Sequence, residues 1–549
     1  MKQDQKKKQR FTQQKSGRSR IKNSQTTSKT AGDGYKDQVE DLKSKTNDPS
    51  WYGYYPELLQ GAASIPFSWT TGTLVDLTGR SPNPSTYIVP GIQAMYLAPS
   101  IGHSQTPSSP VNVAATAIYS FVRHANSGSA NYDSPDLMIM LLSMTQVYSA
   151  ITWLMRIYGE ASLFSQRNRY FPKGLLRAEG VDYDSVATHL ADFRYGINLL
   201  INKAASLSVP ANMSVFKRAA FLYQNIYTEG TSSKDQVYMY VPSGFWKYDP
   251  QPTTGSALTF QPTQYVAQKF DADNLMSYEQ LLSYVADLLD PLLASEDINI
   301  ASGDILKAYG DNGVLKLQAL SENYPIVPIF DIAVLEQMKN AVITGLNTLE
   351  TVDIDQDPET NILISTPRVW ESTNRTAAPE AWNYYLNAYN ESLFLTTTTG
   401  VTDASLVMEN SRLMIAGMGP MQFKANEYSD GDNMMYVDID SGSEICVCAL
   451  IYTIDPGAEA QRGWHDDRIT RCIMYGNYES ININLIARSA AFRFRPRFRL
   501  IIGNSNEFKE RTMDFFDYDN YAVLDPQTIS RIHEAALMSE FAVPIINRR

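Results

Sequence analysis

The densest group of side chains that could do acid–base or metal chemistry lies at residues 464–468, with the sequence Trp-His-Asp-Asp-Arg. An imidazole beside two carboxylates can form an acid–base pair or a site for a divalent cation. The group lies between two strand-like segments, so we interpret it as a solvated turn. The other histidines, at positions 103, 124, 189 and 533, form no pair at ligand spacing.

Other catalytic and metal-binding motifs are absent from the sequence or incomplete. The chain has no Walker loop, no Gly-x-Ser-x-Gly elbow and no His-Glu-x-x-His motif. Residues 353–357 begin like a calcium loop, but Pro358 replaces the required glycine and Ile364 replaces the bidentate glutamate. Residues 438–440 with Glu444 are a weaker variant that we interpret as the end of a hairpin. We therefore expect no enzyme, no metal site, no cofactor and no small-molecule substrate.

The cysteines point to a reducing compartment. Cys446, Cys448 and Cys472 are few and odd in number, and the first two occupy one face of a strand-like run. Without further cysteine or histidine nearby, we expect buried thiols rather than a zinc site. The N-terminus is basic and polar and has no apolar core typical of a signal peptide, so we expect synthesis in a cytosol.

Charge divides the chain into a basic arm and an acidic body. Residues 1–30 carry ten Lys or Arg and one Asp, a net charge of +9, which leaves −21 for residues 31–549 when the total is −12. Residues 1–45 contain few apolar side chains and should be disordered alone. Such an arm is either a solvated tail or a phosphate-neutralising segment that contacts RNA without reading its sequence. The candidate RNA-binding residues are Lys6, Lys7, Lys8, Arg10, Lys15, Arg18, Arg20 and Lys22.

A second group of cations follows a strand-like alternation near the C-terminus. Arg493, Arg495, Arg497 and Arg499 alternate with other residues, so a strand would place four guanidinium groups on one face. Pro496 favours an edge strand. Because the body is acidic, a contact between subunits is favoured over an RNA contact, although arginine suits phosphate and carboxylate alike.

The element that must organise the chain is a long apolar helix. Ser134 is a suitable N-cap, Pro135 suits the first helical position, and Gly159 is a suitable terminator. No residue between Asp136 and Arg156 is charged, and apolar side chains point to all sides. The run is long enough to cross a membrane, but its central Ser, Thr and Gln residues favour a helix buried in a protein core.

Helical patterns precede strand-like patterns along the rest of the chain. Further helices are predicted at about 110–124, 184–207, 212–227, 277–289, 331–346 and 525–540. Strands are predicted near 86–89, 94–97, 393–399, 411–416, 433–440, 444–453, 480–488 and 491–502. The sequence therefore predicts an α+β fold with a predominantly helical first part, a β-rich C-terminal region and a disordered basic N-terminal arm.

Several blocks in the helical part resemble picobirnavirus capsid proteins. The longest, residues 122–138, reads Val-Arg-His-Ala-Asn-Ser-Gly-Ser-Ala-Asn-Tyr-Asp-Ser-Pro-Asp-Leu-Met. Similar blocks follow the family's order at residues 89–92, 156–159, 189–194, 210–226 and 241–245. The resemblance covers about residues 85–250.

This resemblance implies a coat protein with no catalytic residues. It implies dimers that tile a small icosahedral shell in the virion, enclosing double-stranded RNA segments and the viral RNA polymerase, with assembly in the host cell cytoplasm. The expected domains are a basic RNA-facing arm (1–50), a helical shell domain (51–265), a mixed α/β protruding or dimerisation region (266–514) and a C-terminal helix returning to the shell (515–549). The alternative is a cytosolic RNA-binding protein that never forms a closed shell.

Overall fold

The structure is a computed structural model, and it groups the chain into two units, Met1–Ser68 and Trp69–Arg549. In the first unit, only Tyr55 and residues 60–64 are described, and these include the short helix α2 (Gln60–Ala63). In the second unit, the described residues are 73–76, 86–128, 131–163, 171–230, 235–251, 255–345, 349–350, 352–372, 386, 388–400, 402–425, 433–454, 464–475, 479–504, 507–515 and 520–543.

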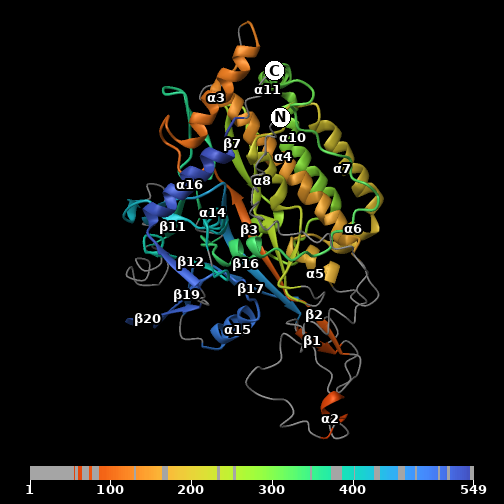
Figure 1. Ribbon diagram of the computed structural model, residues 1–549, viewed down its shortest axis with the longest axis vertical. Coiled ribbons are helices and arrows are strands. Elements are labelled where there is room, and N and C mark those ends of the chain that lie inside the picture. The colour runs from red at the N-terminus through yellow and green to blue at the C-terminus, as the bar shows by residue number, and fades with distance from the viewer. Residues whose placement is uncertain are drawn as a thin grey trace, which may run out of the picture. The chain divides into compact units, whose positions relative to one another are not determined.

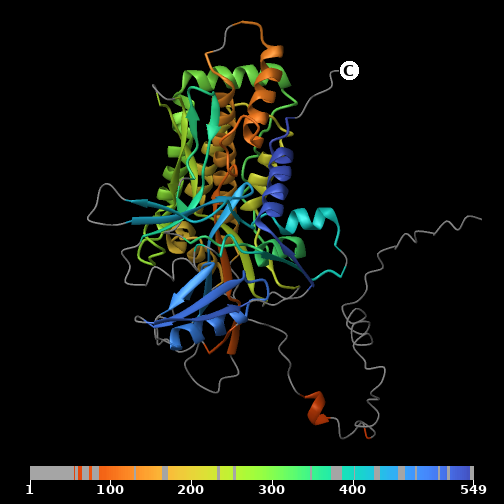
Figure 2. The ribbon, with the colours of Figure 1, turned by 90° about the vertical axis from the view of Figure 1, so that its left-hand side faces the viewer.

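Most of the described helices of the second unit lie before residue 340. They are α3 (Pro110–Ala125), α4 (Ser134–Ala161), α5 (Phe171–Ala178), α6 (Tyr183–Thr188), α7 (Leu190–Ala204), α8 (Ser214–Leu222), α9 (Gln264–Ala267), α10 (Tyr278–Ala294), α11 (Glu296–Tyr309) and α12 (Ile332–Lys339). Later in the chain come α14 (Ala404–Asn410), α15 (Glu479–Ala490) and α16 (Pro526–Glu540). In both ribbon views the helices coloured orange to green lie together (Figure 1 and Figure 2).

Helix α4 is the centre of this helical layer. It packs against α3, α5, α7, α8 and α10, and every residue from 137 to 154 is buried. Thr145, Ser149 and Thr152 donate their hydroxyl groups to backbone carbonyls, as Ser149 Oγ does to Ala219 over 2.9 Å. α4 is also long and apolar enough to cross a membrane, but it is enclosed by protein. The predicted core helix is therefore confirmed.

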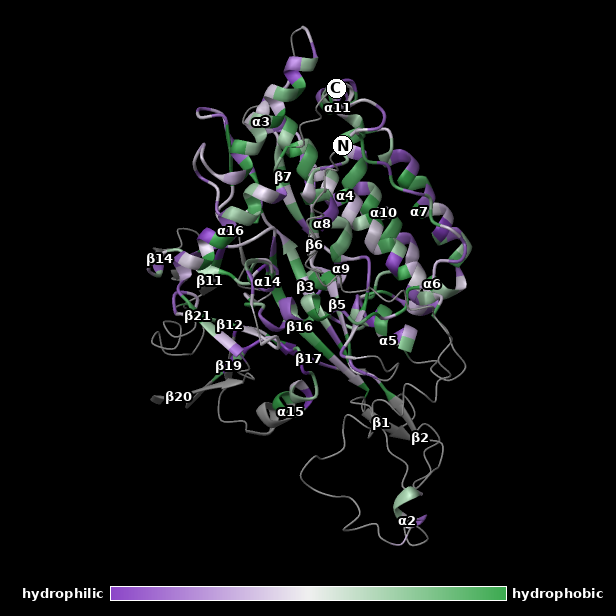
Figure 3. Cartoon of the chain, in the orientation of Figure 1, coloured by the Kyte–Doolittle hydropathy of each residue, from purple (hydrophilic) through white to green (hydrophobic). Residues whose placement is uncertain are grey.

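A five-stranded sheet lies beside the helices, in the order β17-β16-β3-β5-β4. Its strands are β3 (Ile92–Pro99), β4 (Tyr227–Thr228), β5 (Val237–Pro242), β16 (Glu444–Ile454) and β17 (Trp464–Ile469). β3 runs parallel to β5 and antiparallel to β16. All residues of β3, β5 and β16 are buried, and β3 and β16 are coloured mainly hydrophobic in Figure 3. Strands with both faces buried need apolar side chains throughout.

The remaining strands form smaller sheets. β11 (Arg368–Ser372), β13 (Ala416–Gly417), β14 (Gln422–Ala425), β15 (Asn433–Asp440) and β8 (Leu349–Glu350) make a second five-stranded sheet. β18 (Cys472–Tyr475), β19 (Phe498–Asn504) and β20 (Glu507–Phe515) make a third sheet. The pairs are β1 (Thr73–Asp76) with β2 (Thr86–Val89), β6 (Gly244–Asp249) with β7 (Ala257–Pro262), β9 (Asp355–Asp357) with β10 (Ile362–Ile364), and β12 (Leu393–Thr397) with β21 (Asn520–Leu524).

Within the described part of the chain the buried side chains form two hydrophobic cores, and β16 and α16 contribute to both. The larger core contains α4 and the central sheet, and the smaller one gathers side chains from residues 342–445 and Ile529. β16 begins in the smaller core at Ile445 and continues in the larger one. α16 places Ile529 in the smaller core and Leu537 in the larger one. The predicted domain boundaries stay predictions, and these elements connect segments on both sides of them.

The predicted α+β fold is confirmed. Three helices begin with the predicted capping residue, whereas the helix predicted at 212–227 is the shorter α8, which Asn212 does not cap. α10 begins with the predicted capping box of Ser277 and Gln280, and Asp331 and Asp525 cap α12 and α16. The N-cap of α4 is Asp133 rather than Ser134, and its backbone N–H donates to Asp136 over 3.1 Å. α4 also continues past Gly159 to Ala161.

Several strand and helix predictions were wrong. Residues 480–488 form helix α15 rather than a strand, because an apolar–polar alternation this short also fits a helix with Leu485 buried against the sheet. Of residues 411–416, only Ala416 lies in a strand. The predicted helix at 184–207 is divided at His189 into α6 and α7, and α12 ends at Lys339. Residues 438–444 are no hairpin end, because β15 and β16 belong to different sheets.

A glycine substitution tests how tightly α4 is enclosed. A Cβ on Gly159 would lie 2.4 Å from Ile326 Cγ1 and 2.7 Å from the Tyr324 carbonyl oxygen, so Gly159→Ala should lower the free energy of unfolding by about 1–3 kcal/mol. Gly303→Ala is the matched control, because nothing lies within 4 Å of that added Cβ in helix α11. It should stabilise the protein by about 0.5–1 kcal/mol. Urea unfolding measures both, and equal effects would contradict the packing described.

Candidate functional site

Exposed apolar side chains gather on three elements of the second unit. Clusters of exposed large apolar side chains are candidates for interaction sites. The three groups are Tyr195 and Leu199 on α7; Val327, Ile329, Phe330 and Ile332 on the segment leading into α12; and Tyr521 and Val523 on β21.

The predicted arginine strand begins later than expected. Residues 491–497 form turns and loop, and β19 begins at Phe498, so the four guanidinium groups do not line one strand face. The alternate side chains Phe492 and Phe494 are buried against Tyr238, with ring centres 5.8 and 6.0 Å away. Pro496, which has no N–H for a ladder, lies in the same loop.

All four arginines contact other residues of the same chain. A role in a subunit contact stays a prediction for each of them. Arg493 lies 5.4 Å from the ring centre of Phe494, Arg495 donates to the Phe492 carbonyl over 3.2 Å, Arg497 lies 4.7 Å from the ring centre of Phe394, and Arg499 pairs with Glu391 at 2.9 Å.

The basic arm lies outside the described residues. This holds for all eight predicted RNA-binding residues, Lys6, Lys7, Lys8, Arg10, Lys15, Arg18, Arg20 and Lys22. Their contact with RNA therefore stays a prediction from charge alone.

A buried group of charges lies at the C-terminal end of α4. Arg156 pairs with Glu160 one turn later at 3.3 Å and with Glu179 at 2.9 Å, and it also donates to the Tyr240 carbonyl over 2.8 Å. The Trp153 indole N–H donates to Glu179. One guanidinium thus faces two carboxyl groups, and all three side chains are fully buried.

The surroundings of Glu160 favour its neutral form. Burial, followed by the negative charge of Glu179, raises the pKa of Glu160 well above its usual range, although Arg156 opposes the shift. The excess carboxyl of this group therefore holds its proton at pH values where an exposed glutamate is ionised.

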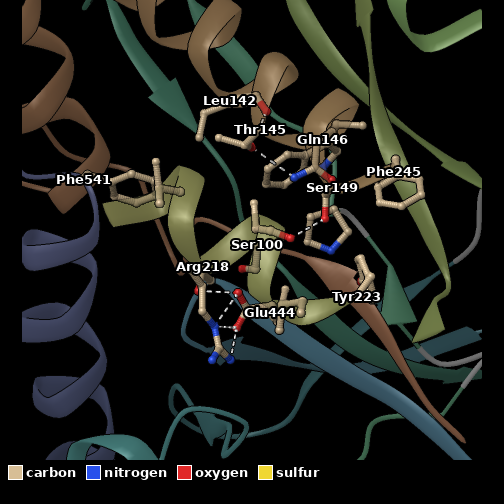
Figure 4. A pocket seen from close by; sticks show the side chains of 16 residues that line it. Ser100, Leu142, Thr145, Gln146, Ser149, Arg218, Tyr223, Phe245, Glu444 and Phe541 are labelled. Atoms are coloured by element: carbon tan, nitrogen blue, oxygen red, sulfur yellow. Dashed lines mark hydrogen bonds and ion pairs between the residues drawn. The ribbon is translucent and has the colours of Figure 1, made fainter. Parts of the chain in front are cut away.

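A second buried ion pair borders a small cavity between α4, α8 and β6. Arg218 donates from Nε and Nη2 to Glu444 over 3.0–3.3 Å, and Figure 4 shows this pair on the wall of the cavity. Leu142, Phe245 and Phe541 contribute apolar walls. The volume is about 40 Å³, which suits a few water molecules and is far smaller than ligand sites of roughly 300–1,000 Å³.

Helix α16 is fixed to the body by further buried polar groups. His533 Nε2 lies 2.8 Å from the Met414 carbonyl oxygen, and Arg412 lies 3.8 Å from Glu540. Burial and the nearby charge of Arg412 lower the pKa of His533 to about 3, so the imidazole is neutral. Burial raises the pKa of Glu540.

The described residues offer no catalytic or metal-binding arrangement. None of them form a group of three His, Cys, Asp or Glu side chains that could hold a metal ion. Residues 464–468 lie in strand β17 rather than in a turn, and Asp467 pairs with Arg488 at 3.0 Å. Cys446 and Cys448 are buried, and burial raises the pKa of Cys448 to about 12, so it stays a thiol.

The buried charges at the end of α4 have a local signal in the sequence, which the motifs above do not include. Arg156 and Glu160 end the long uncharged run at i,i+4 spacing, which favours pairing on a buried helix face. The pair of Arg218 and Glu444 is separated by 226 residues and leaves no local signal.

Comparisons with known proteins agree on one class. A sequence model of the family described as picobirnavirus capsid protein matches residues 51–456. The chain is 28% identical over 524 residues to the capsid protein precursor of Human picobirnavirus (strain Human/Thailand/Hy005102/-), covering 91% of this chain and 92% of that protein. The crystal structure of the picobirnavirus capsid superimposes with a TM-score of 0.73 at 20% identity, covering 90% of this chain and 98% of that chain.

These matches define a viral coat protein, whose role is structural rather than enzymatic and whose place is the virion shell. The chain belongs to the picobirnavirus capsid protein family. The predicted resemblance is thereby confirmed, and the matched fold agrees with the predicted fold class.

The buried carboxyl group predicts a specific pH dependence. Because the folded pKa of Glu160 is raised, its contribution to stability is complete below its unfolded pKa and is lost as pH rises through the folded pKa. Glu160→Gln removes this loss. Between the unfolded and the folded pKa of Glu160, the free energy of unfolding of the variant should therefore rise relative to wild type by up to about 1.4 kcal/mol per pH unit. Urea unfolding of the full chain from pH 5 to pH 9 measures the difference. Glu359→Gln, an exposed control, should show no such trend.

The pair of Arg218 and Glu444 predicts a non-additive double mutant. Arg218→Ala leaves Glu444 buried with Ser443 Oγ as a remaining donor at 2.7 Å, and this should cost about 3–5 kcal/mol. Replacing both partners, as Arg218→Met with Glu444→Leu, should cost less than Arg218→Ala alone. Chemical unfolding measures the loss of stability in each variant. An equal or larger loss in the double variant than in Arg218→Ala would contradict the prediction.

Proposed function

We propose that this chain assembles as dimers into a small icosahedral T=1 shell that encloses double-stranded RNA segments and the viral RNA polymerase. Family membership supports the coat role, and the charge division within the chain supports the RNA part. Assembly takes place in the host cell cytoplasm, where the reduced thiols Cys446 and Cys448 are stable. The shell needs no cofactor and no small-molecule substrate.

The division of charge is the observation that carries the RNA part of this proposal. The arm's net charge of +9 neutralises phosphate, whereas a body of −21 repels it. Contacts confined to phosphates are blind to sequence, as the packaging of unrelated segments requires. A genome that is bound by the basic arms and repelled by the acidic bodies stays mobile enough for a polymerase to copy it.

The same proposal assigns the parts of the chain. Residues 1–50 face RNA in the lumen, and residues 51–265 form the shell. Residues 266–514 form the protruding or dimerisation region, with Arg493, Arg495, Arg497 and Arg499 near a subunit contact. Residues 515–549 return to the shell, and the packing of α16 against α3 and α8 supports this last assignment.

Deletion of residues 1–30 tests the arm. In the full-length protein, log Kobs for duplex RNA should fall against log salt with a slope approaching about −8, because the arm carries +9. The deletion should remove most of this slope and most of the RNA in particles. A variant with the arm residues scrambled is the matched control and should keep both. Undiminished RNA uptake by the deletion would refute the proposal.

The alternative is a cytosolic RNA-binding protein that never closes a shell. Electron microscopy of the purified protein separates the two functions. Uniform spherical particles support the coat function, and small soluble oligomers that bind RNA support the alternative. A protein that stays monomeric and ignores RNA at low ionic strength would exclude both.

A further inference from the structure

Residues 327–332 form the densest exposed apolar segment among the described residues, and we name it the edge segment. The exposed fractions are 63% for Val327, 41% for Ile329, 51% for Phe330 and 39% for Ile332. Four large apolar side chains within six residues are costly to leave in water. Isolated exposed apolar residues need no explanation, but a cluster does.

The edge segment is held firmly at three points. Upstream, the buried Ile326 donates its backbone N–H to Gly159 of α4 over 3.4 Å. In the middle, Ile329 bonds through its N–H to Ile226 at 3.0 Å and accepts from Thr228 at 2.9 Å, along the β4 edge of the central sheet. Its apolar side chains are therefore presented in a fixed arrangement, which lowers the entropy cost of docking.

The downstream end of the edge segment is also fixed. The single charged side chain of the segment, Asp331, is engaged there as the N-cap of α12. Asp331 accepts from the backbone N–H groups of Ala333 and Val334 at 3.1 and 3.4 Å and so caps α12. Pro328 has no N–H, which disfavours the addition of a further strand at this edge. The segment therefore suits side-chain docking onto a partner surface.

The charges of the edge segment and of the body favour a second copy of this chain as the partner. The edge segment has no cation for nucleic acid, and a basic protein would be drawn to the acidic surface elsewhere. Two copies of the body, at −21 each, repel one another except where acidic side chains are absent or engaged. The cores of protein interfaces are depleted of charge and enriched in aromatic residues such as Phe330.

We propose that the edge segment is a contact with a second copy of this chain in the assembled shell, with Phe330 and Val327 as its apolar anchors. This inference rests on the proposed assembly and names a surface that carries it. The contact places the edge of the central sheet, rather than only the β-rich region, against a neighbouring subunit.

Paired charges on the anchors test the contact. Val327→Asp with Phe330→Asp should leave the unfolding midpoint nearly unchanged, because both side chains are exposed, and should lower the yield of sedimenting particles at least tenfold. The matched control is Asn312→Asp with Gln318→Glu, which adds the same charge at exposed polar positions between α11 and α12. The control should assemble normally. Normal assembly of the anchor variant, or equal failure of the control, would overturn the contact.

Thiol labelling gives a second readout that does not depend on disrupting the shell. In a Val327→Cys variant, with wild type as the blank, a maleimide should react at least tenfold more slowly in particles than in free subunits. Equal rates would overturn this contact alone. A wild-type chain that forms no particles would instead contradict the proposed assembly itself.

Discussion

The constraint on which the structure depends is the burial of α4 on every side. A helix with no charged residue between Asp136 and Arg156 has no face for water, so neighbours must cover its whole circumference. Helices α3, α5, α7, α8 and α10 do so, and β6 completes the enclosure. Where charge finally appears on α4, at Arg156, it is still buried and lies against two carboxyl groups there. The larger hydrophobic core and the helical layer are arranged around this requirement.

Prediction from sequence succeeded where the signal is local. Capping residues such as Ser277, Asp331 and Asp525 mark helix starts because their side chains satisfy nearby backbone N–H groups. The uncharged, apolar run between Asp136 and Arg156 predicted that α4 is a buried helix. Prediction failed where tertiary contacts decide, as at residues 480–488, where packing selects a helix over a strand.

The candidate site shows the same limit more strongly. The edge segment can be identified only when the exposure of its side chains is known, because the apolar sequence around Val327 and Phe330 is also typical of a buried core. The pair of Arg218 and Glu444 depends on two elements far apart in the chain. The arginines at 493–499 were identified from a strand pattern, yet two of them, Arg497 and Arg499, contact Phe394 and Glu391 from another part of the chain. The basic arm, by contrast, is defined by composition alone and needed no fold to be recognised.

The pairing of β3 with β16 also sets a timetable for the newly made chain. About 350 residues separate Pro99 from Glu444, so at roughly 5–20 residues per second the ribosome needs roughly 20–70 s to deliver the second strand after the first. Throughout that interval at least one edge of β3 is unpaired, and the central sheet beside α4 is incomplete. A folding intermediate of this kind is a natural client for chaperones, and its completion near the end of translation delays association between nascent subunits.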